Sequence, residues 1–226
     1  KNVYATNSGE DMNDVANAVS IVRKELGKLD EASLQNITEY AFSLRDTFDY
    51  DISESIRSAK ALMDNFGVSG EEAFNLITQG AQNGLDYSGE MLDTISEYSV
   101  QFSKLGFSAE DMFNILQKGT ESGAFNLDKV GDAIKEFSIR AIDGSNTTID
   151  GFTRLGLNAD EMAKKFAAGG DTARGAFEEV VTKIGEMDNS VDQSIVGVDL
   201  FGTMWEDLGP EVVTQLANMT DEYNQA

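Results

Sequence analysis

The side chains that could do chemistry in this chain are almost all carboxylates. The 226 residues include 40 Asp and Glu against 17 Lys and Arg, and they include neither histidine nor cysteine. Disulfides, zinc–thiolate sites, cysteine nucleophiles and histidine-based catalytic triads are therefore excluded. Two kinds of carboxylate chemistry remain to be considered, namely calcium binding by clustered acids and glycoside hydrolysis by paired acids.

The acidic clusters lack the pattern of a calcium-binding loop. Residues 46–54 read DTFDYDISE and contain three aspartates, but the glycine and the spacing of that loop are missing. Asp51 and Glu54 instead have the spacing of a helix start, where a side chain caps free backbone N–H groups. Residues 143–151 read DGSNTTIDG and offer no bidentate acid at the required position. Helix capping and turn formation are the favoured interpretations of the two clusters.

Neither a catalytic pair nor a phosphate-binding loop stands out. A glycosidase needs two acids across a cleft, one of them with a pKa raised by burial, and among 40 acids no pair is singled out. Residues 167–175, AAGGDTARG, lack the Lys-Ser/Thr ending of a P-loop and predict a helix break. The sequence therefore predicts no catalytic residue, no cofactor, no metal ligand, and a protein that is not an enzyme.

The only tryptophan, Trp205, has two interpretations. It lies in the segment FGTMWEDLGPEV, where it could anchor the core between helices or act as a hot spot for a partner. The core role is favoured, and the same holds for the phenylalanines and methionines along the helices, some of which could instead face partners. Gly209 and Pro210 predict a helix that starts with proline at its first position.

The charge argues against nucleic acid as a partner. A formal net charge of −23 repels phosphate backbones and anionic lipids, so we expect this fragment not to bind nucleic acid. No apolar run approaches the roughly 20 residues of a membrane span. The chain begins at Lys1 without an initiator methionine, which suggests an excised fragment, and any membrane contact is expected only through regions outside it.

The composition predicts an all-α protein. There is one proline, hydrophobic residues make up 41%, and continuous β-branched runs are scarce. Two segments repeat at a distance of 39 positions: FGVSGEEAFNLITQG at 66–80 and LGFSAEDMFNILQKG at 105–119. Apolar residues in both copies recur at helical spacing, so each copy predicts a helix with one apolar face.

Each copy also contains a helix stop followed by a helix start. Gly67 and Gly106 can take the left-handed conformation that ends a helix, and an apolar residue follows each glycine. Ser69 and Ser108 are each followed three positions later by an acid, which is the spacing of a capping box. We expect two apolar contacts across these turns, Met63 with Val68 and Phe102 with Phe107. The pattern predicts a helix–turn–helix at each copy.

A third copy, RLGLNADEMAKKFAAGG, follows at an offset of 50 positions. Gly156 repeats the stop, and Asn158 repeats the start. The 11 extra residues coincide with Asp-Gly and Ser-Asn turn formers, so we expect a loop insertion at 143–154, with room for a short helix after the turn.

The repeats define the expected domain organisation. A unit of about 40 residues is a helical hairpin that must stack on its neighbours to bury its apolar face, which gives a compact or solenoid-like domain. We expect a helical lead-in at 1–30, hairpin repeats at 31–142, the loop insertion at 143–154, and the third repeat with C-terminal helices at 155–226.

Several segments together resemble the core region of bacteriophage tail tape measure proteins. They are residues 95–145, FGVSGEEAFNLITQGAQNG and LFGTMWEDLGPEVVTQL, and the likeness extends over roughly residues 34–216. The resemblance implies a virion structural protein that acts in tail assembly, tail-length determination and genome ejection. It implies location in the tail lumen, and in the host cytoplasm during assembly.

The resemblance also implies partners: the tail tube protein, tail assembly chaperones and other tape measure copies. Members of the family often carry membrane segments or peptidoglycan hydrolase domains elsewhere, and no such activity is carried over to this fragment. The alternative is a soluble helical-repeat scaffold that binds some other protein through an exposed groove. Because glycines break its helices, we also expect this region not to be the ruler itself.

Overall fold

The chain forms an all-helical structure, as the sequence predicts. The computed structural model describes residues 9–217 and residue 223, and over these residues it contains thirteen helices and no strand. The chain divides into two units, Lys1–Glu97 and Tyr98–Ala226, and the boundary falls inside one helix. The two units are described separately below.

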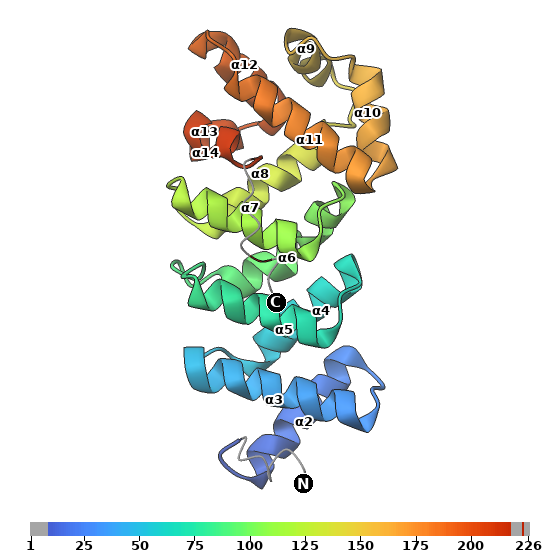
Figure 1. Ribbon diagram of the computed structural model, residues 1–226, viewed down its shortest axis with the longest axis vertical. Helices are drawn as coiled ribbons and strands as arrows, with labels where there is room; N and C mark the ends of the chain where they lie inside the picture. Colours follow the sequence, from blue (N-terminus) through green and yellow to red (C-terminus); the bar gives the residue numbers. More distant parts are fainter. Residues whose placement is uncertain (1–8, 218–222, 224–226) are drawn as a thin grey trace. The chain divides into compact units, whose positions relative to one another are not determined.

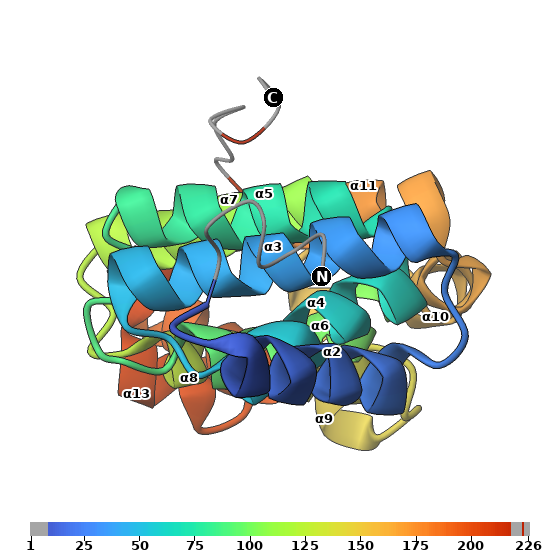
Figure 2. The same cartoon turned by 90° about the horizontal axis from the view of Figure 1, so that it is seen from below.

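The first unit contains four complete helices and the start of a fifth. Within it, α3 and α5 lie side by side in one layer, and α2 and α4 lie in a second layer beneath them (Figures 1 and 2). The helices are α2 (Met12–Leu26), α3 (Glu31–Phe48), α4 (Ile52–Phe66), α5 (Gly70–Gln82) and α6 (Met91–Lys104).

The core of the first unit is built from apolar residues at helical spacing. On α3, Leu34 and Ile37 begin a buried stripe, and on α4, Ile56 and Leu62 face it. Burying side chains of this size contributes ~1.5–3 kcal/mol each relative to exposing them. Buried Ser58 donates a hydrogen bond from its hydroxyl to the Leu92 carbonyl at 2.6 Å, which ties α4 to α6 within this unit.

The second unit begins in α6 and contains eight further helices. Here α8 packs on α12 and α13, α11 packs on α10 and α14, and α9 packs on α12. The helices are α7 (Ala109–Glu121), α8 (Leu127–Arg140), α9 (Asn146–Arg154), α10 (Ala159–Ala168), α11 (Gly170–Gly185), α12 (Ser190–Phe201), α13 (Met204–Leu208) and α14 (Pro210–Gln215).

An aromatic cluster forms the centre of the second unit. The ring of Phe137 lies 5.2 Å from that of Phe166, 5.1 Å from that of Phe177 and 4.9 Å from that of Phe201. Two of these pairs are edge-to-face, an arrangement worth ~0.5–1.5 kcal/mol per pair beyond simple burial. Because its four rings come from α8, α10, α11 and α12, this cluster fixes four helices against one another.

The spacing of the repeat reappears in the helices. α7 begins and ends 39 positions after α5, and α10 begins 50 positions after α7. Helical hairpins of about 40 residues are consistent with this arrangement.

The segment expected to be a loop insertion is mostly helical. Within 143–154, α9 runs from Asn146 to Arg154, and only the residues before it form a turn. The hydroxyl of Ser145 accepts a hydrogen bond from the Thr148 N–H at 3.3 Å, so the polar residues that suggested a loop begin a helix instead. Buried Phe152 on this helix stacks 6.4 Å from Phe166, so α9 packs against α10 through this ring pair.

Candidate interaction sites

The first repeated turn joins α4 to α5. Gly67 has a φ of +73°, and its N–H donates to the Met63 carbonyl at 2.9 Å. Ser69 and Glu72 form a reciprocal capping box: the Glu72 N–H donates to the Ser69 hydroxyl at 3.2 Å, and the Ser69 N–H donates to the Glu72 carboxylate at 2.7 Å. The bond from the Ser69 N–H lowers the pKa of Glu72, because it favours the ionised form.

The second repeated turn, between α6 and α7, also consists of a glycine at positive φ followed by a serine that caps the next helix. Gly106 has a φ of +81°, and the N–H of Phe107 donates to the Phe102 carbonyl at 3.2 Å. The rings of Phe102 and Phe107 lie 6.0 Å apart, so this expected apolar contact is present. Ser108 and Asp111 form a capping box with distances of 3.0 and 2.9 Å.

The third turn, between α9 and α10, follows the pattern of the second. Gly156 has a φ of +70°, and the Leu157 N–H donates to the Phe152 carbonyl at 2.9 Å. Asn158 accepts the Glu161 N–H at 3.0 Å and begins α10. All six residues predicted from the turns therefore act on helix ends, which is a positioning role.

One turn residue also forms an ion pair with another helix. The Asp111 carboxylate, which caps α7, lies 3.1 Å from the Arg174 guanidinium on α11. The Asp111 side chain is nearly buried, so its charge is stabilised by both the helix N-terminus and the arginine. This ion pair therefore connects the start of α7 to α11.

The aspartates of residues 46–54 act at helix ends. Asp51 is the N-cap of α4 and accepts the Glu54 N–H at 3.0 Å, as the spacing predicts. Asp49 ends α3 in the left-handed conformation, with a φ of +62°. Asp46 pairs with Arg45 at 3.0 Å.

A small acidic hollow of about 100 Å³ lies beside this segment in the first unit. Burial, together with a hydrogen bond to Asp86, raises the pKa of Tyr50 at its edge. Asp86 also accepts the Met91 N–H at 2.9 Å, so this carboxylate caps α6. Across residues 9–217 and 223, no group of three or more Asp or Glu has the geometry of a metal site. The lining residues are Asp49, Tyr50, Asp51, Glu54, Asp86, Gly89, Leu92 and Asp93.

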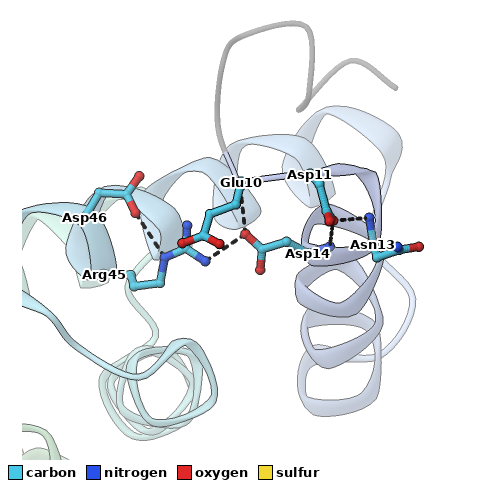
Figure 3. Close-up of polar contacts among 6 residues, drawn as sticks. All are labelled: Glu10, Asp11, Asn13, Asp14, Arg45 and Asp46. Carbon is cyan, nitrogen blue, oxygen red and sulfur yellow. Dashed lines mark hydrogen bonds and ion pairs between the residues drawn. The ribbon is translucent and has the colours of Figure 1, made fainter.

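A polar network fixes the start of α2 against the end of α3 (Figure 3). The Asp14 carboxylate accepts hydrogen bonds from the Arg45 guanidinium at 2.8 Å and from the Glu10 N–H at 2.9 Å. Partial burial works to raise the pKa of Asp14, but these two donors outweigh it and hold the pKa below its usual value. Asp11 caps α2 by accepting the Asn13 and Asp14 N–H groups.

The glycine-rich stretch 167–175 is a break between two helices. α10 ends at Ala168 and α11 begins at Gly170, with Gly169 and Gly170 both at positive φ. Among the residues that the structure describes, no side chain caps the start of α11.

Trp205 lies in the core of the second unit. Its side chain is buried, and its ring lies 6.4 Å from that of Phe201. A Cβ on Gly197 would lie 2.0 Å from Trp205 Cδ2, so the indole packs directly on the α12 backbone. Pro210 occupies the first position of α14, as its sequence context predicts.

The sequence reasoning missed an exposed apolar face on α12. Val191, Ile195 and Val198 lie on the solvent side of this helix, while its other side is buried. The sequence SVDQSIVGVDLF indicates this face, because its apolar residues fall on both sides of the helix. Where only one side packs on the rest of the isolated chain, the apolar residues of the other side stay exposed. Over the described ranges, no helix is both long and apolar enough to cross a membrane.

Comparison with known proteins shows the family of this chain. The family model described as "Phage-related minor tail protein" matches residues 4–202. The "Probable tape measure protein" of Streptomyces phage phiC31 is 43% identical over 138 residues, which covers 61% of this chain. The match covers 19% of that relative, so the chain spans only part of its length. No solved structure matches. The chain belongs to the phage-related minor tail protein family and is a structural phage tail protein.

Proposed function

We propose that this chain is a folded segment of a tape measure protein that acts in tail assembly, tail-length determination and genome ejection. The observation that carries the proposal is the 43% identity over 138 residues to a probable tape measure protein. The role is structural rather than catalytic: its acids cap helices, and its turn residues hold helix ends in place.

The segment is proposed to flank the ruler and not to form it. A ruler needs a continuous rod, in which an α-helix rises ~1.5 Å per residue. The longest helix among the described residues has 18 residues, and glycines at positive φ stop the helices at the repeated turns. Helices interrupted in this way fold back on each other, so their length does not add along a tail axis.

The proposed partners are the tail tube protein, tail assembly chaperones and other tape measure copies, met in the tail lumen and in the host cytoplasm during assembly. An acidic surface suits a lumen that DNA later traverses, because a net charge of −23 disfavours retention on phosphate. Contact with a membrane is assigned to regions outside this segment.

The test is an in-frame duplication of one module, residues 68–106, in a phage that carries this gene. Tail lengths are measured by electron microscopy, and mass spectrometry of purified tails checks that the chain is present. If the module lay extended as helix, 39 added residues at ~1.5 Å each would lengthen the tail by roughly 58 Å. We expect a much smaller change or defective assembly, and deletion of the same module serves as the matched control.

Two results would contradict the proposal in different ways. Fertile phage with tails longer by the full amount would make these hairpins part of the ruler. Absence of the chain from purified tails would remove the tape measure assignment and favour the alternative, a helical-repeat scaffold that binds another protein.

A further inference from the structure

The outer face of α12 is apolar and uncovered. Val191 is 65% exposed, Ile195 38% and Val198 39%, and their spacing of four and three residues places them on one side of the helix. An apolar stripe continuous over two turns differs from the single exposed hydrophobic residues that are ordinary on protein surfaces. We call Val191, Ile195 and Val198 the α12 stripe.

The α12 stripe lies in an open hollow of about 520 Å³. Ser190 and Ser194 complete the hollow, and their small side chains allow another backbone to approach closely. The stripe extends over seven residue steps, or ~10 Å of helix, which is about two turns. This is the length over which an amphipathic helix lays its apolar side chains into a partner's surface.

Carboxylates border the α12 stripe. Asp199 lines the hollow, and Asp150 on the adjacent α9 lies close enough for the two negative charges to repel each other. Within the described part of the chain, neither forms a hydrogen bond or an ion pair, although the positive charges of Arg154 and Arg140 also attract Asp199. Asp192 is already paired with Arg154 at 3.4 Å. Among the described residues, the Asp199 carboxylate therefore lies at the α12 stripe without an ion-pair partner, and the Asp150 carboxylate lies near it.

We propose that the α12 stripe docks an amphipathic helix of another protein whose apolar side is flanked by Lys or Arg. The apolar side would cover the stripe, and the cations would pair with Asp199 and Asp150. A second copy of this chain fits less well, because it would bring the same aspartates and a further net charge of −23 to the contact. The inference does not depend on the proposed function, since it follows from the surface itself.

The test measures binding of three synthetic helical peptides to the whole chain by fluorescence anisotropy. All three carry the same leucine stripe, and the flanking residues are lysine, glutamine or glutamate. We expect the lysine peptide to bind most tightly, the glutamine peptide more weakly and the glutamate peptide least. Equal binding of the lysine and glutamate peptides would overturn the proposed chemistry of the partner.

The stripe itself is tested with Ile195→Asp. This change adds a negative charge, which would strengthen non-specific attraction of a cationic peptide, so any weakening must come from the lost apolar contact. We expect affinity for the lysine peptide to fall about tenfold or more, as removal of one buried isoleucine predicts. Val191→Ser, at the most exposed stripe position, keeps the test valid if Ile195→Asp does not fold, and should weaken binding in the same direction.

Phe125→Asp is the matched control. Phe125 lies between α7 and α8 in the same unit, is 84% exposed and does not line the hollow at α12; the change removes more apolar surface while adding the same charge. We expect binding within about twofold of the unmodified chain. If Phe125→Asp weakens binding as much as Ile195→Asp, the peptide binds non-specifically and the site is wrong.

Analytical ultracentrifugation measures the oligomeric state, and so tests the alternative that a second copy of this chain covers the α12 stripe. If the unmodified chain forms a dimer that Ile195→Asp abolishes, the α12 stripe is covered by a second copy and the proposal fails. A monomer that binds the lysine peptide at one-to-one stoichiometry supports it.

Discussion

Gly106 lies so close to the backbone of Gly170 that a side chain on Gly106 does not fit between them. A Cβ on Gly106 would lie 1.9 Å from the Gly170 carbonyl oxygen and 2.6 Å from its Cα. The turn that precedes α7 therefore packs directly on the backbone at the start of α11. At the corresponding turn, no described residue other than its chain neighbours has a heavy atom within 4 Å of the Cβ position of Gly67.

Gly106→Ala should be far more destabilising than Gly67→Ala. Both glycines have positive φ, which alone makes alanine unfavourable by ~1 kcal/mol. At position 106 the methyl group must also displace a backbone, so we expect a loss of roughly 3 kcal/mol or more, or failure to fold. Chemical denaturation followed by circular dichroism measures both. Equal losses in the two variants would show that the close approach is absent.

Gly175→Ala is the control for the glycine argument. Gly175 lies inside α11, and beyond its chain neighbours and the backbone of its own helix no described residue comes within 4 Å of its Cβ position. Because glycine weakens a helix interior, alanine should stabilise the protein here by ~0.5–1 kcal/mol. A loss of stability at this position would indicate that substitutions of glycine are harmful for a reason other than φ or close contact.

Ser108→Ala should be more destabilising than Ser69→Ala. Removing either capping hydroxyl costs ~1 kcal/mol on average. At Ser108 the change also disturbs Asp111, whose nearly buried carboxylate pairs with Arg174 at 3.1 Å, so we expect a loss of about 2 kcal/mol. Thermal denaturation measures the difference. Ser108→Thr keeps the hydroxyl and should retain most of the stability; a loss as large as that of alanine would argue against capping.

The features predicted from the sequence are those set by local chemistry. The glycine stops and the serine starts follow from neighbouring residues alone, and the buried faces of α5 and α7 follow from their apolar spacing. The segment 143–154 was expected to be mainly a loop because its Asp-Gly and Ser-Asn pairs favour turns, whereas α9 occupies most of it. Packing of Phe152 on Phe166, which no local pattern encodes, stabilises a helix there.

Tertiary contacts account for what the sequence could not indicate. The repeat made Gly67 and Gly106 look equivalent, and only the approach of Gly170 distinguishes them. The α12 stripe was hidden because α12 has apolar residues on both sides, and which side is buried depends on where α8 and α9 pack.

Asp199→Asn should raise the melting temperature at neutral pH. Burial, together with the nearby Asp150 carboxylate, raises the pKa of Asp199 despite attraction from Arg154 and Arg140. A raised pKa in the folded state gives a stabilising contribution at low pH, which is lost as the pH rises through that pKa. Because asparagine cannot ionise, the variant keeps this stabilising contribution when the pH rises. The gain over the unmodified chain should be present at pH 7 and should vanish below the ordinary aspartate pKa of about 3.9.

Asp192→Asn is the matched control for this pH dependence. Asp192 lies on the same helix but pairs with Arg154 at 3.4 Å, so its charge is satisfied by a cation. No gain is expected at pH 7, because exposed ion pairs contribute ~0–1 kcal/mol and their loss is neutral or slightly unfavourable. A gain as large as that of Asp199→Asn would mean that lower net charge, and not the surroundings of Asp199, is responsible.

Gly197→Ala should displace the indole of Trp205, the only tryptophan, although Trp205 itself is not substituted. A Cβ at position 197 would lie 2.0 Å from Trp205 Cδ2, and the indole is buried, so it has no free space to move into. Overpacking of this kind costs ~1–3 kcal/mol. We expect a lower melting temperature and a red-shifted, more quenchable tryptophan emission in the native state. Gly185→Ala, whose Cβ would meet Thr214 at an ordinary 3.5 Å, should not lower the melting temperature and should leave the emission unchanged. Because Trp205 is the only tryptophan, its emission reports on the second unit alone, and an unchanged spectrum in Gly197→Ala would show that the indole does not pack on α12.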